Sequence, residues 1–167
     1  MRKGFTMIEL IFVIVIIGIL AAVAIPKLAA TRTDAKVSKI AANLSTLISD
    51  AGSYYTSQGQ TKWQDANVTD ITNVTLYTGA TESAATLATS TDPWSSSSAS
   101  TIQHFYLVAN PSAPTTSVCI DINTTSDGNI SVGPGGYSTS TSVCDGVKAQ
   151  VKSMFKEYQF GGVGIVR

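Results

Sequence analysis

The chain has 167 residues, and its 11 lysines and arginines balance its 11 aspartates and glutamates, so its formal net charge is zero. Only 13% of the residues are charged, whereas 44% are hydrophobic. This neutral balance argues against a nucleic-acid-binding surface, which requires a basic stripe, and no specific nucleic-acid partner is predicted. The length predicts one folded domain in addition to an anchor segment.

The chain begins with a short basic leader that runs into an apolar segment. Arg2 and Lys3 precede an unbroken apolar run over residues 10–25. Together with residues 5–8 and 29–30, this run is long enough to cross a membrane as a helix. The basic residues place the N-terminus in the cytoplasm by the positive-inside rule. We therefore predict a single-pass membrane segment.

Glu9 is the anomalous residue of the apolar segment. A charge at the bilayer centre costs at least about 2.5 kcal/mol on insertion scales, so an acid there indicates a function with a specific partner. The best partner is a free α-amine, which cleavage between Gly4 and Phe5 would create on a neighbouring copy of the chain.

An ordinary secretory signal peptide is the alternative interpretation. The Ala-Val-Ala triplet at residues 22–24 fits the small-x-small pattern that precedes a signal-peptidase site. That interpretation gives Glu9 no role, and the helical pattern continues through the supposed cleavage point. We favour a retained helix.

The N-terminus resembles that of type IV pilins and pseudopilins. The resemblance covers residue 3 to about residue 28 and rests on Gly4, Phe5, Thr6, Glu9, Gly18 and Pro26. It implies that prepilin peptidase cleaves after Gly4 and methylates the new N-terminal Phe5. It also implies that the helix between Gly18 and Pro26 can melt in an assembled filament, although a proline in a membrane helix can instead produce only a kink.

Beyond Pro26 the apolar residues recur at three- and four-residue steps, which is typical of an amphipathic helix. We expect the anchor, residues 5–28, and the amphipathic half, residues 29–57, to form one long helix after a leader at residues 1–4. Residues 58–73 are predicted to be a connecting loop in which Trp63 packs on the domain.

Short segments rich in β-branched and aromatic residues follow, and they predict four strands, at residues 74–78, 103–109, 117–122 and 129–133. An Asp-Gly turn signal at 127–128 predicts that the last two form a hairpin. A long helix followed by antiparallel strands is an α+β arrangement, and it is also the type IV pilin fold that the resemblance implies. The α+β headgroup is expected over residues 58–167.

Three further segments of the headgroup carry predictions. Residues 82–101 are poor in large side chains and are expected to be a mobile surface loop that buries little. Residues 134–142 are expected to form a second loop, closed by Cys144. The last part of the chain is predicted to contain one helical face and then a short strand at 163–166; the face comprises Val147, Val151, Met154, Phe155 and Tyr158.

The two cysteines are Cys119 and Cys144. Outside the cytoplasm, an even pair in a small domain is expected to form a disulfide, which stabilises a loop of this length by about 3–4 kcal/mol. Two separate buried thiols are the alternative. The resemblance implies that residues 119–144 correspond to the disulfide-bounded region of type IV pilins.

The chain lacks the common signatures of catalysis. His104 is the only histidine and lies in an apolar strand pattern, so a structural role is favoured over that of a base. Residues 123–130 repeat the oxygen-ligand spacing of a calcium loop but lack the closing acid, which favours a plain hairpin turn. We predict that the protein is not an enzyme and has no cofactor.

Three asparagines are candidate glycosylation sites. Asn67, Asn123 and Asn129 each lie in an Asp-x-Asn-x-Ser/Thr sequence, which resembles the longer acceptor motif of bacterial N-oligosaccharyltransferases. Asn43 and Asn73 match only the shorter form. The alternative is that these residues cluster because Asp, Asn, Ser and Thr all favour turns.

The predicted function is that of a type IV pilin, a structural subunit that assembles with copies of itself into a helical surface filament. Its expected partners are prepilin peptidase, the pilus or secretion assembly machinery, and the inner membrane before assembly. A periplasmic pseudopilin of a type II secretion or DNA-uptake system is the alternative within the same class. An anchored periplasmic binding module that never polymerises is the alternative from another class.

Overall fold

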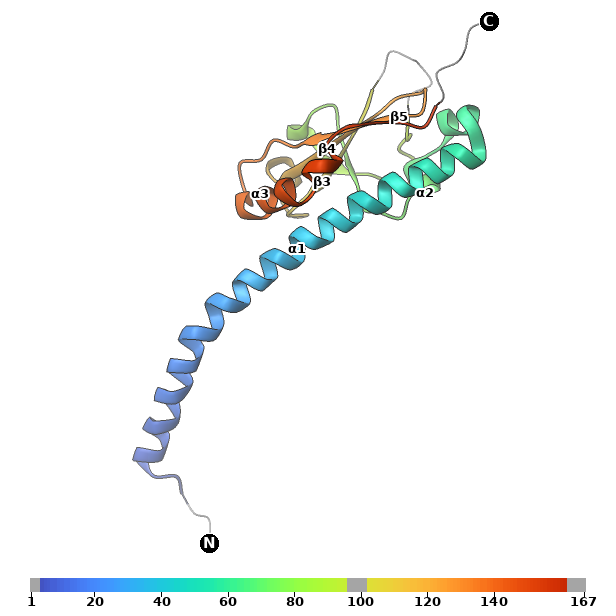
Figure 1. The fold of residues 1–167 in the computed structure, drawn as a ribbon. Helices are drawn as coiled ribbons and strands as arrows, with labels where there is room; N and C mark the ends of the chain where they lie inside the picture. The colour runs from blue at the N-terminus through green and yellow to red at the C-terminus, as the bar shows by residue number, and fades with distance from the viewer. Residues whose placement is uncertain (1–3, 96–101, 162–167) are drawn as a thin grey trace, which may run out of the picture. The chain divides into compact units, whose positions relative to one another are not determined.

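The computed structural model of the chain describes residues 4–95 and 102–161 (Figure 1). It divides into two compact units, Met1–Ala35 and Lys36–Arg167. The first unit contains the apolar part of the N-terminal helix. The second contains the rest of that helix and the sheet, and we call it the headgroup.

Helix α1 spans Met7–Asp65 and continues through Pro26. Its one residue with non-helical backbone angles is Gly59, at φ 78° and ψ 178°, a region that favours glycine. The predicted helix end near residue 57 corresponds to this break, but the helix then resumes as far as Asp65. The predicted loop at 58–73 is therefore wrong, since its second half also contains helix α2, Val68–Ile71.

Trp63 explains why the segment after Gly59 is ordered. Its ring is completely buried, and its Nε1–H donates to the carbonyl oxygen of Thr125 at 2.8 Å. It also meets Tyr55 edge-on, with 5.4 Å between ring centroids. The prediction that Trp63 packs on the domain is thus confirmed, and this packing stabilises the last turns of α1 against the headgroup.

The headgroup contains a six-stranded antiparallel sheet in the order β2-β1-β3-β4-β5-β6. The strands are β1 Tyr77–Thr78, β2 Thr86–Leu87, β3 Gln103–Val108, β4 Val118–Thr124, β5 Asn129–Pro134 and β6 Glu157–Gln159. The predicted hairpin between the last two sequence-identified strands is confirmed as β4–β5, and Gly128 in its turn has a φ of 81°. The sequence pattern missed β2 and β6, which are only two and three residues long.

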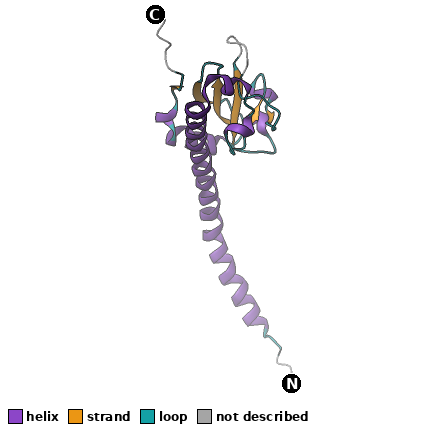
Figure 2. Cartoon of the chain, turned by 90° about the vertical axis from the view of Figure 1, so that its right-hand side faces the viewer, coloured by secondary structure: helices purple, strands orange, loops and turns teal. Residues whose placement is uncertain are grey.

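The part of α1 in the headgroup covers one face of the sheet (Figures 1 and 2). Its buried stripe is the one that the three- and four-residue spacing predicts: Val37, Ile40, Ala41, Leu44, Leu47 and Ala51. The sheet side of this core comes from alternating residues of the central strands, including Phe105, Leu107, Ile120, Ile122 and Ile130. Each fully buried aliphatic side chain contributes about 1.5–3 kcal/mol, so this interface is the main source of headgroup stability.

Residues 82–95 depart from the predicted mobile loop. They include the 3₁₀ helix η1, Glu82–Ala84, and strand β2. Trp94 is completely buried and stacks on Phe105, with 5.0 Å between ring centroids. The expectation of little burial is therefore wrong here, because one tryptophan anchors a segment whose average composition is polar. Residues 96–101 lie outside the described residues.

The C-terminal part also differs from the prediction. The 3₁₀ helix η2, Pro114–Thr116, precedes β4, and helix α3 spans Thr141–Gln150. The predicted loop at 134–142 therefore ends earlier, and Cys144 lies within a helix. The predicted helical face is also wrong beyond Gln150. The chain continues as η3, Lys152–Met154, and then as β6, because Tyr158 pairs with Ile130 at the edge of the sheet. The predicted strand at 163–166 lies outside the described residues.

Candidate processing and assembly site

The start of α1 is organised by a reciprocal pair of hydrogen bonds between Thr6 and Glu9. Glu9 Oε2 accepts from the Thr6 backbone N–H at 2.8 Å and from the Thr6 hydroxyl at 2.7 Å. The backbone N–H of Glu9 is directed at Thr6 Oγ1 at 3.4 Å. This is a capping box, which satisfies donors that a helix start leaves without intrahelical partners.

The capping box refines the role that the sequence indicated for Glu9. Both bonds from Thr6 reach Oε2, and among the described residues Oε1 of Glu9 accepts none. One oxygen therefore orients the carboxylate while the other is available to a further donor. Sequence analysis did not single out Thr6 as the cap, although its Thr-x-x-Glu spacing is the recognised signal for one.

The helix surface around Glu9 is apolar on every side. The large apolar side chains of this segment range in exposure from 41% at Ile16 to 85% at Phe5. By length and composition the segment could cross a membrane. A helix that is hydrophobic all round requires burial in lipid or in a core of other helices. In the single chain, the described part of this surface is not buried by other residues.

Gly18 and Pro26 lie within the continuous helix. A Cβ atom added at Gly18 would meet nothing within 4 Å, so in the single chain no contact requires glycine there. Pro26 has no N–H to donate to the carbonyl of the preceding turn, which weakens the helix locally. The melting of this segment in a filament remains a prediction.

The first 25 residues match the family described as the prokaryotic N-terminal methylation motif. That motif is the signature of type IV pilins and pseudopilins, and the chain carries it. The helix and antiparallel sheet described above form an α+β, type IV pilin-like arrangement. No curated protein and no solved structure matches the chain.

These findings support a pilin-like or pseudopilin-like precursor. The apolar N-terminal helix together with the motif suits a membrane-anchored form of it. The motif points to a structural subunit, to processing by prepilin peptidase and to assembly with pilus-type machinery.

The predicted disulfide is present between Cys119 in β4 and Cys144 in α3. The two Cα atoms are 4.8 Å apart, and both residues are fully buried. The bond ties α3 to a central strand, so the alternative of two separate thiols is wrong.

The three candidate glycosylation sites occupy different environments. Asn67 precedes α2, and its backbone N–H donates to Asp70 Oδ2 at 2.9 Å. Asn129 begins β5, whereas Asn123 lies within β4 between two paired strands. The side-chain oxygen of Asn123 is buried and has no hydrogen-bond partner within the described structure. All three residues are partly buried, and modification of any of them remains a prediction.

His104 lies opposite Asn123 in the β3–β4 register, and its Nδ1 is 4.0 Å from Asp121 Oδ1. Burial raises the pKa of Asp121, and the nearby His104 opposes that shift. Burial, with a further contribution from Asp121, raises the pKa of Tyr106 to about 12. No group of three His, Cys, Asp or Glu side chains in the described ranges could hold a metal ion.

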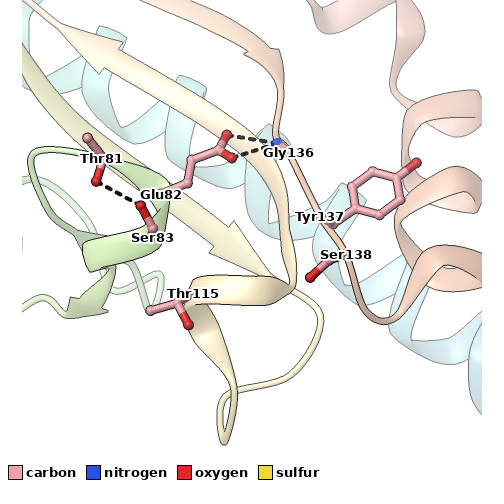
Figure 3. Close-up of a pocket in the computed structure, with 7 residues that line it drawn as sticks. All are labelled: Thr81, Glu82, Ser83, Thr115, Gly136, Tyr137 and Ser138. Atoms are coloured by element: carbon pink, nitrogen blue, oxygen red, sulfur yellow. Dashed lines mark hydrogen bonds between the residues drawn. The ribbon is translucent and has the colours of Figure 1, made fainter.

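A shallow hollow of about 440 Å³ lies between η1 and the loop after β5 (Figure 3). Its one carboxylate, Glu82, accepts the backbone N–H of Gly136 at 2.8 and 2.9 Å. Beside it, the Tyr137 hydroxyl donates to Asp145, and Lys148 Nζ lies 4.4 Å from the Tyr137 ring centroid. Glu82 in the hollow and Asp145 and Lys148 beside it thus hold the loop after β5 in place, so the hollow has a structural role.

Proposed function

We propose that the protein is a type IV pilin, a structural subunit of a helical surface filament. The observation that carries this proposal is the uncovered apolar surface of α1 with an oriented carboxylate, Glu9, near its start. Packing against the same segment of neighbouring copies would cover this surface. At about 25 cal/mol per Å² of apolar area removed from water, such packing gives many kcal/mol per subunit.

In this proposal the chain is built from four parts: a leader at 1–4, an anchor at 5–28, an amphipathic half-helix at 29–57 and the remaining α+β part of the headgroup at 58–167. Cleavage after Gly4 would leave Phe5 with a free amine, which prepilin peptidase would methylate. The free oxygen of Glu9 would receive this amine from the next subunit and so set the register. Because lipid is as apolar as the filament core, extraction from the membrane requires external work from an assembly machine.

Before assembly the precursor would span the inner membrane once, with its N-terminus in the cytoplasm. After assembly it would lie in an extracellular pilus. The disulfide and the Ser/Thr-rich headgroup are consistent with an extracellular environment.

A periplasmic pseudopilin is the second candidate function. The chain continues well past the second cysteine, and β6 in this continuation adds an edge strand to the sheet. This departs from the usual pilin pattern, in which the disulfide lies near the end of the domain. Detection of the protein in a filament on the cell surface would distinguish the pilin function from the pseudopilin function.

The N-terminus of the native protein provides the direct test. Mass spectrometry on native membranes and on material sheared from the cell surface should detect N-methylated Phe5 as the first residue. A first residue at Ile25 would instead identify a secreted domain. An intact Met1 would identify an anchored module that does not polymerise, and either of these outcomes would overturn the proposal.

A further inference from the structure

A groove on the headgroup lies between the first turns of its helix and one end of the sheet. Its volume is about 390 Å³. The helical wall comes from α1, and the opposite wall comes from β1, β2, the end of β3 and the loop that follows it. The lining residues are Lys36, Lys39, Ile40, Asn43, Thr75, Tyr77, Leu87, Leu107, Val108, Ala109 and Pro111.

The floor of the groove is apolar, and one side of it bears an exposed leucine. Ile40 and Leu107 belong to the headgroup core, so the floor is rigid. Leu87 is 56% exposed, and Ile102, at 50%, is the only other large hydrophobic residue with a highly exposed side chain in the described headgroup. A headgroup that covers nearly all its large apolar side chains thus leaves one of them beside a groove. This favours an occupant with an apolar part.

The charged groups of the groove are both positive. Lys36 and Lys39 line it from α1, and no carboxylate is among the lining residues. Among the described residues, no Asp or Glu oxygen lies within 4.0 Å of either ammonium group. The nearest acid in sequence, Asp34, is not part of the lining. The charge of the groove is therefore available to an anionic group on the occupant.

We propose that this groove binds an anionic phospholipid from the membrane that holds the precursor. An acyl chain would lie on the apolar floor against Leu87, and the phosphate would lie between Lys36 and Lys39. The inference rests on membrane insertion of the precursor and not on filament assembly.

The sequence around the groove favours lipid as the occupant. Lys36 follows the anchor by only eight residues, Arg32 lies within this interval, and Lys27 lies at the end of the anchor itself. Basic clusters directly beside a membrane segment attract anionic lipid, and each charge near the surface contributes roughly a fivefold increase in binding. The anchor keeps the headgroup tethered to the bilayer, so lipid is present at high local concentration.

Photo-crosslinking in defined bilayers tests the proposal. The full-length chain, with a benzophenone amino acid in place of Leu87, is placed in nanodiscs of phosphatidylcholine alone or with phosphatidylglycerol. Intact-mass spectrometry should detect a phosphatidylglycerol adduct. In the double variant Lys36→Gln/Lys39→Gln the adduct should fall at least about tenfold, and added salt should weaken it in the parent chain.

The matched control is Lys62→Gln/Lys152→Gln, which removes the same charge from exposed lysines outside the groove. It should retain the adduct. Equal labelling of both lipids, an equal loss in the control, or a crosslink to a second copy of the chain in place of lipid would each overturn the proposal. Because the readout needs no filament, failure of the pilin assignment would leave this result interpretable.

Discussion

At the scale of single residues, Glu9 has two separable roles in the proposed assembly. One oxygen closes the capping box with Thr6. The other accepts no hydrogen bond among the described residues and would receive the amine of a neighbouring subunit. The first role needs only a hydrogen-bond acceptor, whereas the second needs a negative charge. Glutamine preserves the acceptor and removes the charge, so substitution separates the two roles.

We predict that Glu9→Gln and Glu9→Val both insert into the membrane as monomers and form no filaments. Loss of one partner of a buried ion pair typically costs about 3–5 kcal/mol, and this loss would recur at every subunit contact. Electron microscopy of sheared surface material, with immunoblots of the membrane fraction, measures both results. Normal filaments from Glu9→Gln would contradict the charge pairing.

The raised pKa of Asp121 leads us to predict that the stability of the headgroup depends on pH. Burial raises the pKa of this carboxyl in the folded state, so above the unfolded-state pKa its charge destabilises the fold. This destabilisation disappears as the pH falls through the folded-state pKa and the group becomes protonated.

Asp121→Asn should therefore melt at a higher temperature than the parent at pH 7, and the difference should shrink as the pH falls through the acidic range in which Asp121 titrates. Thermal unfolding of the full chain in detergent, followed by circular dichroism from pH 3 to pH 7, measures it. Glu157→Gln, at an exposed position of edge strand β6, is a control for the lost negative charge. A difference in melting temperature that stays constant from pH 3 to pH 7 would contradict a raised pKa of Asp121.

At the scale of elements, the disulfide holds α3 to the sheet. Helix α3 has ten residues, too few to be stable alone in water. Its buried residues, Val143, Cys144 and Val147, attach it to the core, and Cys144 adds the covalent link to β4.

We expect Cys119→Ser/Cys144→Ser to lower the free energy of unfolding by about 3–4 kcal/mol, the chain-entropy value for a loop that closes over 25 residues. Hydrogen exchange should accelerate most in α3 and least in β3 and β4, because the central strands retain their pairing on both sides. Equal acceleration in both regions would show that α3 does not depend on this bond.

At the scale of the whole molecule, cleavage after Gly4 would convert the precursor into the subunit that assembles. A Cβ atom added at Gly4 would meet nothing within 4 Å, so a substitution there leaves the fold unchanged.

We predict that Gly4→Ser leaves an uncleaved, unmethylated chain in the membrane and abolishes filaments, because the α-amine of Phe5 is never released. Mass spectrometry of the N-terminus measures processing. Gly133→Ser is the matched control, since a side chain there also meets nothing within 4 Å and lies far from the leader in sequence. Methylated Phe5 on the Gly4→Ser protein would contradict the predicted cleavage site.

The features that depend on local pattern could be predicted from the amino-acid sequence. The apolar run, the three- and four-residue stripe of α1 and the turn at Gly128 are periodic or conformational signals that neighbouring residues specify, and the structure confirms them. The N-terminal motif could also be recognised from local sequence, because its residues lie within one short segment.

The features that depend on contacts between distant residues could not be predicted in this way and became visible only in the folded chain. Trp63 orders the end of α1 through a carbonyl 62 residues away, and Trp94 fixes a polar segment by stacking on β3. Tyr158 adopts a strand because β5 offers it an open edge. Each of these contacts brings together parts of the chain that no local pattern relates, and the burial and pairing that they provide outweigh local propensity.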